Sequence, residues 1–224
     1  MASALMEASA DDIEFRDGNF TVMGTDKSMS MTDVAKMFYM PAGPVVKLGL
    51  GLEAAGSYAG VPGGAPNYPN GCQVCEVEVD PETGKVTLDR LVAVDDLGMV
   101  INPLICEGQI HGGIAQGVGQ ALIENVVYDR ESGQLLTGTL LDYGMPRADD
   151  LPMFVSELVE IPAKTNPLGI KGIGESGTIG APPTIINAVV DALRSLGVEH
   201  IDMPATPQRV WEAIRSAKAG DGRA

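Results

Sequence analysis

The chain has 224 residues, of which 45% are hydrophobic and 20% charged, and its mean hydropathy is +0.10. These values are ordinary for a folded protein and leave room for one large domain or two small ones. The formal net charge of −15 argues against a nucleic-acid partner, because phosphate binding requires a basic surface.

The sequence contains no segment of the kind that enters or crosses a membrane. The residues after Met1 lack the basic flank and apolar core of a signal peptide, and no apolar run approaches the roughly 18 residues of a membrane span. The three cysteines, an odd number, do not suggest a disulfide framework and fit a reducing compartment. We therefore expect a cytoplasmic protein with no membrane span.

The pattern of apolar and turn residues predicts small elements in the first part of the chain. They are the end of a helix within 3–8, a hairpin that joins 13–15 to 19–22 around Asp17 and Gly18, a helix that starts near Ser30, and a long loop over 41–69.

The second part of the chain carries the clearer signals. In chain order they are alternating stretches at 72–79 and 86–94 around a turn at 81–84, a glycine-interrupted helix over 103–125, a hairpin that pairs 126–128 with 135–137, an alternating stretch at 154–161, a helix opened by Pro182 and Pro183 and stopped at Gly197, and a last helix after Thr206 that ends near 217. Hairpins and separate helices in this order predict an α+β fold, with β-hairpins, a mixed sheet and packed helices.

Cys72 and Cys75 form a C-x-x-C pair, a spacing that by itself suggests zinc or redox chemistry. They lie in an alternating stretch, and residues three apart on a strand face opposite sides of the sheet. Neither His111 nor His200 has the spacing of a partner ligand, and an iron–sulfur cluster needs four ligands. We therefore expect structural cysteines, with Cys106 in the core, and no metal held directly by this chain.

Gly172, Gly174 and Gly177 match the G-x-G-x-x-G spacing of a dinucleotide-binding turn. That turn must follow a buried strand directly and open a helix at once. Here two prolines interrupt the preceding residues, the helix is expected only from Pro182, and no strand that ends in an acid follows. An ordinary dinucleotide site is therefore disfavoured.

The same segment is chemically unusual. Lys171 and Glu175 stand in a run otherwise made of glycine, isoleucine, serine and threonine. Glycines let a backbone approach a bound group closely, and removal of Glu175 from water there would raise its pKa and suit it to general-base work. The alternative is a solvated loop glutamate, and the spacing alone leaves both open.

The run from Gly108 to Gln120 is rich in glycine and carries Gln109 and Gln116. Each glycine costs a helix roughly 1 kcal/mol relative to alanine, so this density needs a reason. A ligand could lie against the glycine face, with the glutamines as hydrogen-bonding groups. The alternative is close packing of two helices through these glycines, which the spacing alone favours somewhat.

The segment from Gly169 to Gly177, followed by Gly180-Ala-Pro-Pro, resembles the catalytic segment of the molybdopterin-binding subunit in the xanthine oxidase family. The resemblance is closest to its carbon monoxide dehydrogenase-like and aldehyde oxidoreductase-like branch. Further matching blocks follow in family order and cover nearly the whole chain: 68–71, 76–84, 101–103, 107–113, 142–147 and 206–211.

The resemblance implies an activity and a site. Members of the family oxidise a carbon centre of a small molecule with oxygen derived from water, and the electrons leave through 2Fe–2S clusters to FAD on partner subunits. The glutamate that matches Glu175 acts as general base for the attacking oxygen. The resemblance implies that Gln109 hydrogen-bonds the cofactor. It also implies that the segment from Asp95 to Asn102, which includes Asp96 and Leu97, wraps the pterin or dinucleotide end. The backbone of Lys171, Gly172 and Gly174 is implied to pass close to the molybdenum.

The bacterial branch implies molybdopterin in its cytosine dinucleotide form, with the molybdenum held through the pterin. The resemblance makes residues 1–217 the C-terminal portion of a molybdopterin-binding domain, as one unit or as two subdomains around the loop at 41–69, with 218–224 a flexible tail. The family's molybdenum subunit is several times longer than this chain.

The resemblance therefore implies three partners: the remainder of the molybdenum subunit, an iron–sulfur subunit and a FAD subunit. Many relatives have cysteine at the position of Leu97, so one polar contact to the cofactor is absent here or comes from backbone. The alternative function is a noncatalytic assembly remnant of such a subunit, which binds no cofactor alone.

Overall fold

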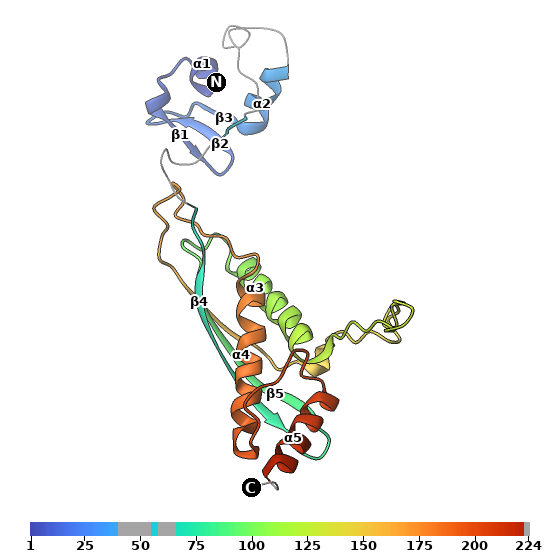
Figure 1. The fold of residues 1–224 in the computed structure, drawn as a ribbon. Helices are drawn as coiled ribbons and strands as arrows, with labels where there is room; N and C mark the ends of the chain where they lie inside the picture. Colours follow the sequence, from blue (N-terminus) through green and yellow to red (C-terminus); the bar gives the residue numbers. More distant parts are fainter. Residues whose placement is uncertain (40–54, 58–65, 222–224) are drawn as a thin grey trace. The chain divides into compact units, whose positions relative to one another are not determined.

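The structure is a computed structural model that describes residues 1–39, 55–57 and 66–221 (Figure 1). Most of the long loop expected over 41–69 lies outside the described residues. The chain divides into two units, Met1–Ala59 and Gly60–Ala224, and each is described by itself.

The first unit contains a small antiparallel sheet and two helices. The sheet has the order β1 (Ile13–Arg16), β2 (Asn19–Val22) and β3 (Ser28–Ser30), and the helices are α1 (Ala2–Met6) and α2 (Met31–Tyr39), with a 3-10 turn at Ala10–Asp12. The expected hairpin is confirmed, with pairing from Ile13↔Val22 to Arg16↔Asn19.

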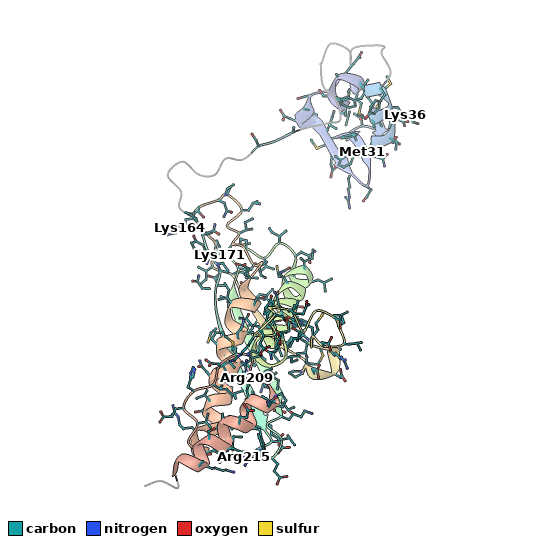
Figure 2. The ribbon with its side chains drawn as sticks, turned by 45° about the vertical axis from the view of Figure 1, so that its right-hand side comes forward. Met31, Lys36, Lys164, Lys171, Arg209 and Arg215 are labelled. Atoms are coloured by element: carbon teal, nitrogen blue, oxygen red, sulfur yellow. The ribbon has the colours of Figure 1, made fainter. Side chains whose placement is uncertain are left out.

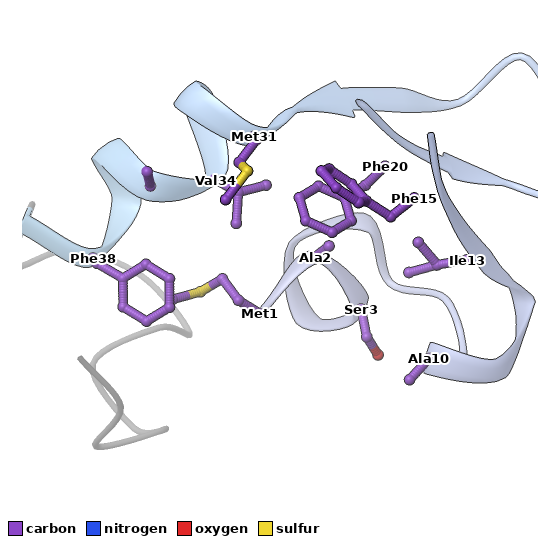
Figure 3. A pocket seen from close by; sticks show the side chains of 11 residues that line it. Met1, Ala2, Ser3, Ala10, Ile13, Phe15, Phe20, Met31, Val34 and Phe38 are labelled. Carbon is purple, nitrogen blue, oxygen red and sulfur yellow. The ribbon is translucent and has the colours of Figure 1, made fainter. Parts of the chain in front are cut away.

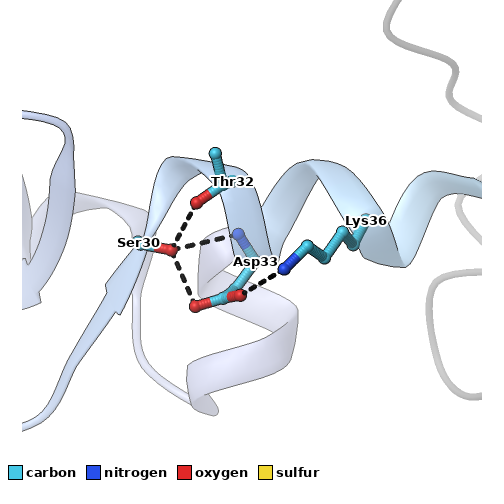
Figure 4. A network of polar contacts seen from close by, with 4 residues as sticks. All are labelled: Ser30, Thr32, Asp33 and Lys36. Carbon is cyan, nitrogen blue, oxygen red and sulfur yellow. Dashed lines mark hydrogen bonds and ion pairs between the residues drawn. The ribbon is translucent and has the colours of Figure 1, made fainter.

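The start of α2 follows the predicted N-cap pattern. The Asp33 amide donates to Ser30 Oγ at 3.1 Å, and Ser30 Oγ donates to the Asp33 carboxylate at 2.7 Å (Figure 4). Lys36 pairs with the same carboxylate at 3.4 Å. The bond from Ser30 and then Lys36 lower the pKa of Asp33, so the negative charge stays at the helix N-terminus, where it is favourable.

An apolar cavity of about 390 Å³ lies in this unit (Figure 3). Its lining includes Met1, Phe15, Phe20, Val34 and Phe38, and the rings of Phe15 and Phe20 are 4.6 Å apart. Phe15 remains 52% exposed, so the small core of this unit does not cover its own aromatic side chains.

The second unit is built on a mixed sheet, as predicted. β4 (Asn70–Val79) and β5 (Val86–Asp96) pair antiparallel with a bulge between Glu76 and Val77, and β6 (Val155–Val159) pairs parallel with β5. Gly84 in the β4–β5 turn has φ +74°, and a Cβ there would lie 2.0 Å from the Pro207 carbonyl oxygen. Only glycine therefore fits this turn.

The helices of the second unit are α3 (Pro103–Val118), which continues as a π-helical turn at Gly119–Ile123, α4 (Ser176–Leu193), with a 3-10 turn at Arg194–Leu196, and α5 (Pro207–Asp221). A further 3-10 turn covers Ala148–Asp150. α5 continues past the predicted end at 217 to Asp221. Among the described residues, no helix is long and apolar enough to cross a membrane.

α3 and α4 run side by side in the same direction, and glycines allow their close approach (Figure 1). A Cβ at Gly113 would lie 2.9 Å from the Thr178 amide nitrogen, and one at Gly177 would lie 2.3 Å from the Ile110 carbonyl oxygen. Helix packing thus explains part of the glycine-rich run. Gly112, on the same helix, has nothing within 4 Å of such a Cβ.

The core of this unit lies between the sheet and the helices. Its most deeply buried large side chains are Leu91 from β5, Ile110, Ile114 and Val118 from α3, Ile185, Val189 and Leu193 from α4, and Val210 and Ile214 from α5. The helix periodicity of these positions is what the sequence predicts for faces turned toward one core.

The predicted start of α4 at Pro182 is wrong, because the helix begins at Ser176 and contains both prolines. A proline in a helix interior removes a hydrogen bond to the residue four positions earlier, which favours a first-turn position. Two contacts stabilise the earlier start: the close packing of Gly177 on α3, and Gln73 Nε2, which donates to the carbonyls of Ser176 at 3.4 Å and Gly177 at 3.2 Å.

Two other expectations are only partly met. The hairpin expected at 126–137 consists of one isolated bridge, Tyr128↔Leu135, because Asp129 closes the turn without a longer ladder beside it. The expected strand at 154–161 shortens to β6. In the described chain, Cys72 is exposed, Cys75 and Cys106 are half-buried, and all three are free.

Candidate functional site

The glycine-rich segment 169–175 runs beside the residues that follow β5. Gly98 and Ile170 form an antiparallel bridge, the Lys171 amide donates to the Leu97 carbonyl at 2.9 Å, and the Met99 amide donates to the Gly169 carbonyl at 3.0 Å. A Cβ at Gly98, which has φ +66°, would lie 2.2 Å from the Gly169 carbonyl oxygen. Glycine at position 98 therefore permits this contact.

The side chain of Asn166 holds the same segment from its other side. Its Nδ2 donates to the Ile170 carbonyl at 2.8 Å, and its Oδ1 accepts from the Ile170 amide at 3.0 Å. Asn166 is a positioning residue that the sequence alone did not indicate. A side-chain amide that satisfies both groups of one residue fixes the backbone of the segment just before Lys171.

Asp96 and Lys171 form an ion pair whose side chains are 11% and 10% exposed. Asp96 Oδ1 also accepts from the amides of Gly98 at 2.9 Å and Ile161 at 3.1 Å. The hydrogen bond from Lys171 is the largest of the effects that hold the pKa of Asp96 below its ordinary value, against the opposing effect of burial. The pair joins the end of β5 to the glycine-rich segment (Figure 2 labels Lys171).

Gln109 connects α3 to the same segment. Its Nε2 donates to the Gly174 carbonyl at 3.0 Å, one residue before Glu175. Gly172 and Gly174 are exposed, and a Cβ at either would meet nothing within 4 Å. Gln109 therefore holds this backbone in place, while the space beside Gly172 and Gly174 stays open. A bound group could approach the backbone closely at these two glycines.

Glu175 occupies the N-cap position of α4, and its carbonyl accepts from the Ile179 amide at 3.0 Å. Its side chain makes no capping hydrogen bond and is exposed. The removal from water expected for this glutamate is therefore not provided by the described part of the chain. Its backbone is fixed, but its carboxylate still faces solvent.

The earlier start of α4 also corrects one argument against a dinucleotide turn, since the glycine segment does open a helix directly. The other two arguments hold, because loop residues separate the end of β6 at Val159 from Gly172 and no strand follows the segment among the described residues. Gly177 is accounted for by its contact with α3.

Two predicted site residues have structural contacts of their own. Leu97 is 3% exposed with its side chain in the core, so only its backbone reaches the segment. Asn102 caps α3 by accepting from the Ile105 amide at 3.3 Å. Among the described residues, no group of three His, Cys, Asp or Glu could hold a metal ion, and the C-x-x-C pair lies on β4.

Large apolar side chains on the elements that hold this site are exposed. They are Met99, Ile101, Leu104, Ile105, Ile161, Leu168 and Ile179. They come from the segment after β5, the first turns of α3 and α4, and the loop after β6. Apolar exposure on this scale is typical of a surface that another chain or segment covers.

Residues 1–152 match the sequence family described as a molybdopterin cofactor-binding domain. The chain belongs to this family. It is 39% identical over 218 residues to the carbon monoxide dehydrogenase large chain of Hydrogenophaga pseudoflava, and 39% identical over 221 residues to the nicotine 6-hydroxylase large subunit of Paenarthrobacter nicotinovorans. Each match covers 96% of this chain and 26% of the relative.

The fold agrees with these relatives. The reconstituted carbon monoxide dehydrogenase from Oligotropha carboxidovorans superimposes with a TM-score of 0.75 at 32% identity, over 98% of this chain and 27% of that chain. The chain thus spans about a quarter of the length of the relatives it matches. It is a portion of a molybdenum-binding subunit of this family, as the sequence motifs predicted.

Proposed function

We propose that the chain forms part of a molybdenum hydroxylase that oxidises a carbon centre of a small molecule, such as an aldehyde or an N-heterocycle, and that it supplies the catalytic base Glu175. The observation that carries the proposal is the way the segment before Glu175 is held. Asp96 with Lys171 and Gln109 with Gly174 fix it from two sides, while its glycines stay open.

The residues present suit one wall of a molybdopterin site. Gly172 and Gly174 offer backbone without side chains, Gln109 holds the backbone behind them, and the pair of Asp96 and Lys171 lies close by. When bound, the molybdenum cofactor supplies the two-electron oxidation with oxygen from water. We infer that it is the cytosine dinucleotide form and that Leu97 and Asn102 lie beside its pterin or dinucleotide end.

Glu175 contributes a carboxylate that accepts a proton at one of its oxygens. The N-cap position places it at the start of an 18-residue helix, where a negative charge is favourable. A general base must lie within hydrogen-bonding reach of the proton it takes, so the fixed backbone on both sides of Glu175 determines where that oxygen can lie.

We infer that the remainder of the molybdenum subunit covers the exposed apolar residues around the site. An iron–sulfur subunit with 2Fe–2S clusters and a FAD subunit would then carry the electrons away, as the family resemblance implies. We place the assembled enzyme in the cytoplasm, where three free cysteines stay reduced.

The cofactor proposal is tested by expression of the chain together with the remaining subunit segments encoded beside it. The purified complex should contain molybdenum and pterin in equal amounts, by elemental analysis and by pterin fluorescence after oxidation. An assembled complex that contains neither would contradict the proposal and favour a noncatalytic assembly role.

The role of Glu175 is tested in the same complex with Glu175→Gln. We expect unchanged molybdenum and pterin content, with turnover of an aldehyde and N-heterocycle panel reduced by about 10²–10⁴-fold, the usual contribution of a general base. Glu199→Gln, an exposed glutamate beyond the other end of α4, is the matched control and should keep full turnover. Retained turnover in Glu175→Gln would remove this residue from the mechanism.

A further inference from the structure

A small cavity lies between the β4–β5 pair and the start of α4, and its chemistry is not used by the proposed reaction. Its volume is about 140 Å³. We call it the Asp95 cavity; it is lined by 69–71 and Gln73 from β4 and the residues before it, Asp95 from β5, and Ser176, Ile179 and Gly180 from α4.

Three buried oxygen atoms in the lining have no hydrogen-bond partner within the described part of the chain. They are Asp95 Oδ2, Gln73 Oε1 and Ser176 Oγ. Asp95 is only 3% exposed. Buried polar atoms in proteins are nearly always paired, so three unpaired oxygens from three separate elements around one cavity indicate a group that satisfies them together.

The orientation of the Gln73 amide is fixed by its other contacts. Its Nε2 donates to the carbonyls of Ser176 and Gly177, so a flipped amide would place oxygen against oxygen. Gln73 Oε1 is therefore an acceptor and cannot donate. A group that satisfies it must carry a proton donor or a positive charge.

Two glycines lie directly against the side chains that carry two of these oxygens. A Cβ at Gly71 would lie 2.4 Å from Asp95 Oδ1, and a Cβ at Gly180 would lie 2.7 Å from the Gln73 amide nitrogen. The carboxylate and the amide thus pack directly on backbone, and a side chain at either glycine would displace them.

The charge in the cavity is unbalanced. Among the described residues, no lysine, arginine or histidine lines the cavity, and Lys171 is already paired with Asp96. Burial raises the pKa of Asp95, as expected for a carboxylate without a counter-charge. A single positive charge would balance the site.

We propose that the Asp95 cavity binds one monovalent cation through Asp95, Gln73 and Ser176. Carboxylate, amide and hydroxyl oxygens are ligands for hard cations, and divalent sites commonly use more than one carboxylate. The volume suits a cation with a few waters, at about 30 Å³ per water, and falls well below the roughly 300 Å³ of a substrate pocket. The cation is an inorganic ion or the ammonium head of a side chain, and both share this chemistry.

The test uses the full chain in tetramethylammonium chloride, which keeps ionic strength constant and cannot donate hydrogen bonds. Sodium, potassium or methylammonium chloride replaces it stepwise while Tm is followed by Trp211 fluorescence. We expect a saturable rise of about 5 °C or more at 100-fold excess over Kd in at least one arm. A response to sodium or potassium identifies an inorganic ion, and a response to methylammonium alone identifies a side-chain head.

Variants locate the effect. Asp95→Asn should abolish the saturable rise in Tm, and Ser176→Ala should raise the Kd for the cation several-fold. Asp89→Asn changes an exposed carboxylate on the same strand and should leave both the rise in Tm and the Kd unchanged. If Asp95→Asn does not fold, the comparison of Ser176→Ala with Asp89→Asn decides the matter. No saturable rise in any arm, or a rise that persists in both Asp95→Asn and Ser176→Ala, overturns the proposal.

Discussion

The pair of Asp96 and Lys171 makes a sharp prediction about stability. Asp96→Asn keeps the size of the side chain and an oxygen that can still accept from the amides of Gly98 and Ile161. The substitution replaces the oxygen that faces Lys171 with an amide NH2 group, so it removes both the charge and the hydrogen bond of the pair. It therefore isolates the ion pair from the two backbone contacts of the same side chain.

The expected magnitude follows from burial. Removal of one partner from a buried ion pair usually costs about 3–5 kcal/mol, because the other charge stays buried without compensation. Each side chain here is about a tenth exposed, and the two hydrogen bonds to backbone amides survive. We therefore expect Asp96→Asn to lower the free energy of unfolding by about 3 kcal/mol. Asp96→Ala also leaves two amides unpaired and should cost more, about 5 kcal/mol.

The pH dependence has a definite sign. The pKa of Asp96 is held below its ordinary value of 3.8, so the unfolded chain takes up this proton first as pH falls. The contribution of the pair to the free energy of unfolding is therefore complete above pH 3.8 and is lost as pH falls through the lower folded pKa. The difference in the free energy of unfolding between the native chain and Asp96→Asn should become smaller as pH falls below 3.8.

Urea unfolding between pH 3 and pH 7 measures both the loss in the free energy of unfolding and its change with pH. Trp211 is the single tryptophan and lies on α5 in the same unit, so its fluorescence reports on the relevant transition. Asp33→Asn, an exposed carboxylate in the other unit, is the control. Equal stability of Asp96→Asn and the native chain at pH 7, or a gap that does not change with pH, would refute this account of the pair.

Three further predictions concern neighbouring positions. Asp95→Asn should raise the free energy of unfolding at neutral pH in cation-free buffer. Because burial raises the pKa of Asp95, the contribution of Asp95 to the free energy of unfolding falls as pH rises above 3.8. Urea unfolding at a series of pH values should show this fall in the native chain and not in the variant. Gly113→Ala should cost about 2 kcal/mol by overpacking against Thr178, whereas Gly112→Ala, with open space, should gain up to about 1 kcal/mol in thermal unfolding; equal effects would contradict the packing of α3 on α4. Burial raises the pKa of Cys75 to about 11, so at pH 8 an alkylating reagent should label exposed Cys72 well before Cys75, as peptide mass spectrometry would show.

Local patterns predicted most of the elements, and the failures have physical causes. The β4–β5 hairpin follows from alternation around a turn that only Gly84 can close. The parallel pairing of β6 with β5 could not be read from β6 itself, because alternation carries no direction. The start of α4 was misplaced because the contacts of Gly177 and Gln73, which outweigh the prolines, come from distant parts of the chain.

The site was predictable as a set of residues but not as a set of contacts. Motif resemblance singled out Asp96, Lys171, Gln109 and Glu175. That Asp96 meets Lys171 depends on the bridge between Gly98 and Ile170, which no local pattern encodes.

The cavity beside the neighbouring Asp95 could not be predicted for a related reason. Alternation along β5 does predict that Asp95 and Asp96 face opposite sides of the sheet. It does not reveal that Gln73 and Ser176, from β4 and α4, would leave their own oxygens unpaired beside Asp95.

The proposed role of Glu175 as general base has two requirements, and its contacts separate them. Position comes from this chain, because Asn166, Lys171 and Gln109 fix the backbone up to Gly174 and α4 fixes it from Ser176 onward. The described part of the chain does not remove the carboxylate from water, since Glu175 is exposed. The conformational entropy cost of ordering the segment is therefore met when the chain folds. In the proposed complex, association with the remainder of the subunit would only have to remove the Glu175 carboxylate from water. It follows that Asp96→Asn, which loosens the segment, should lower turnover in the proposed complex even where the complex is fully assembled, whereas a polar substitution at exposed Leu104 should weaken association and leave the turnover of the assembled complex unchanged.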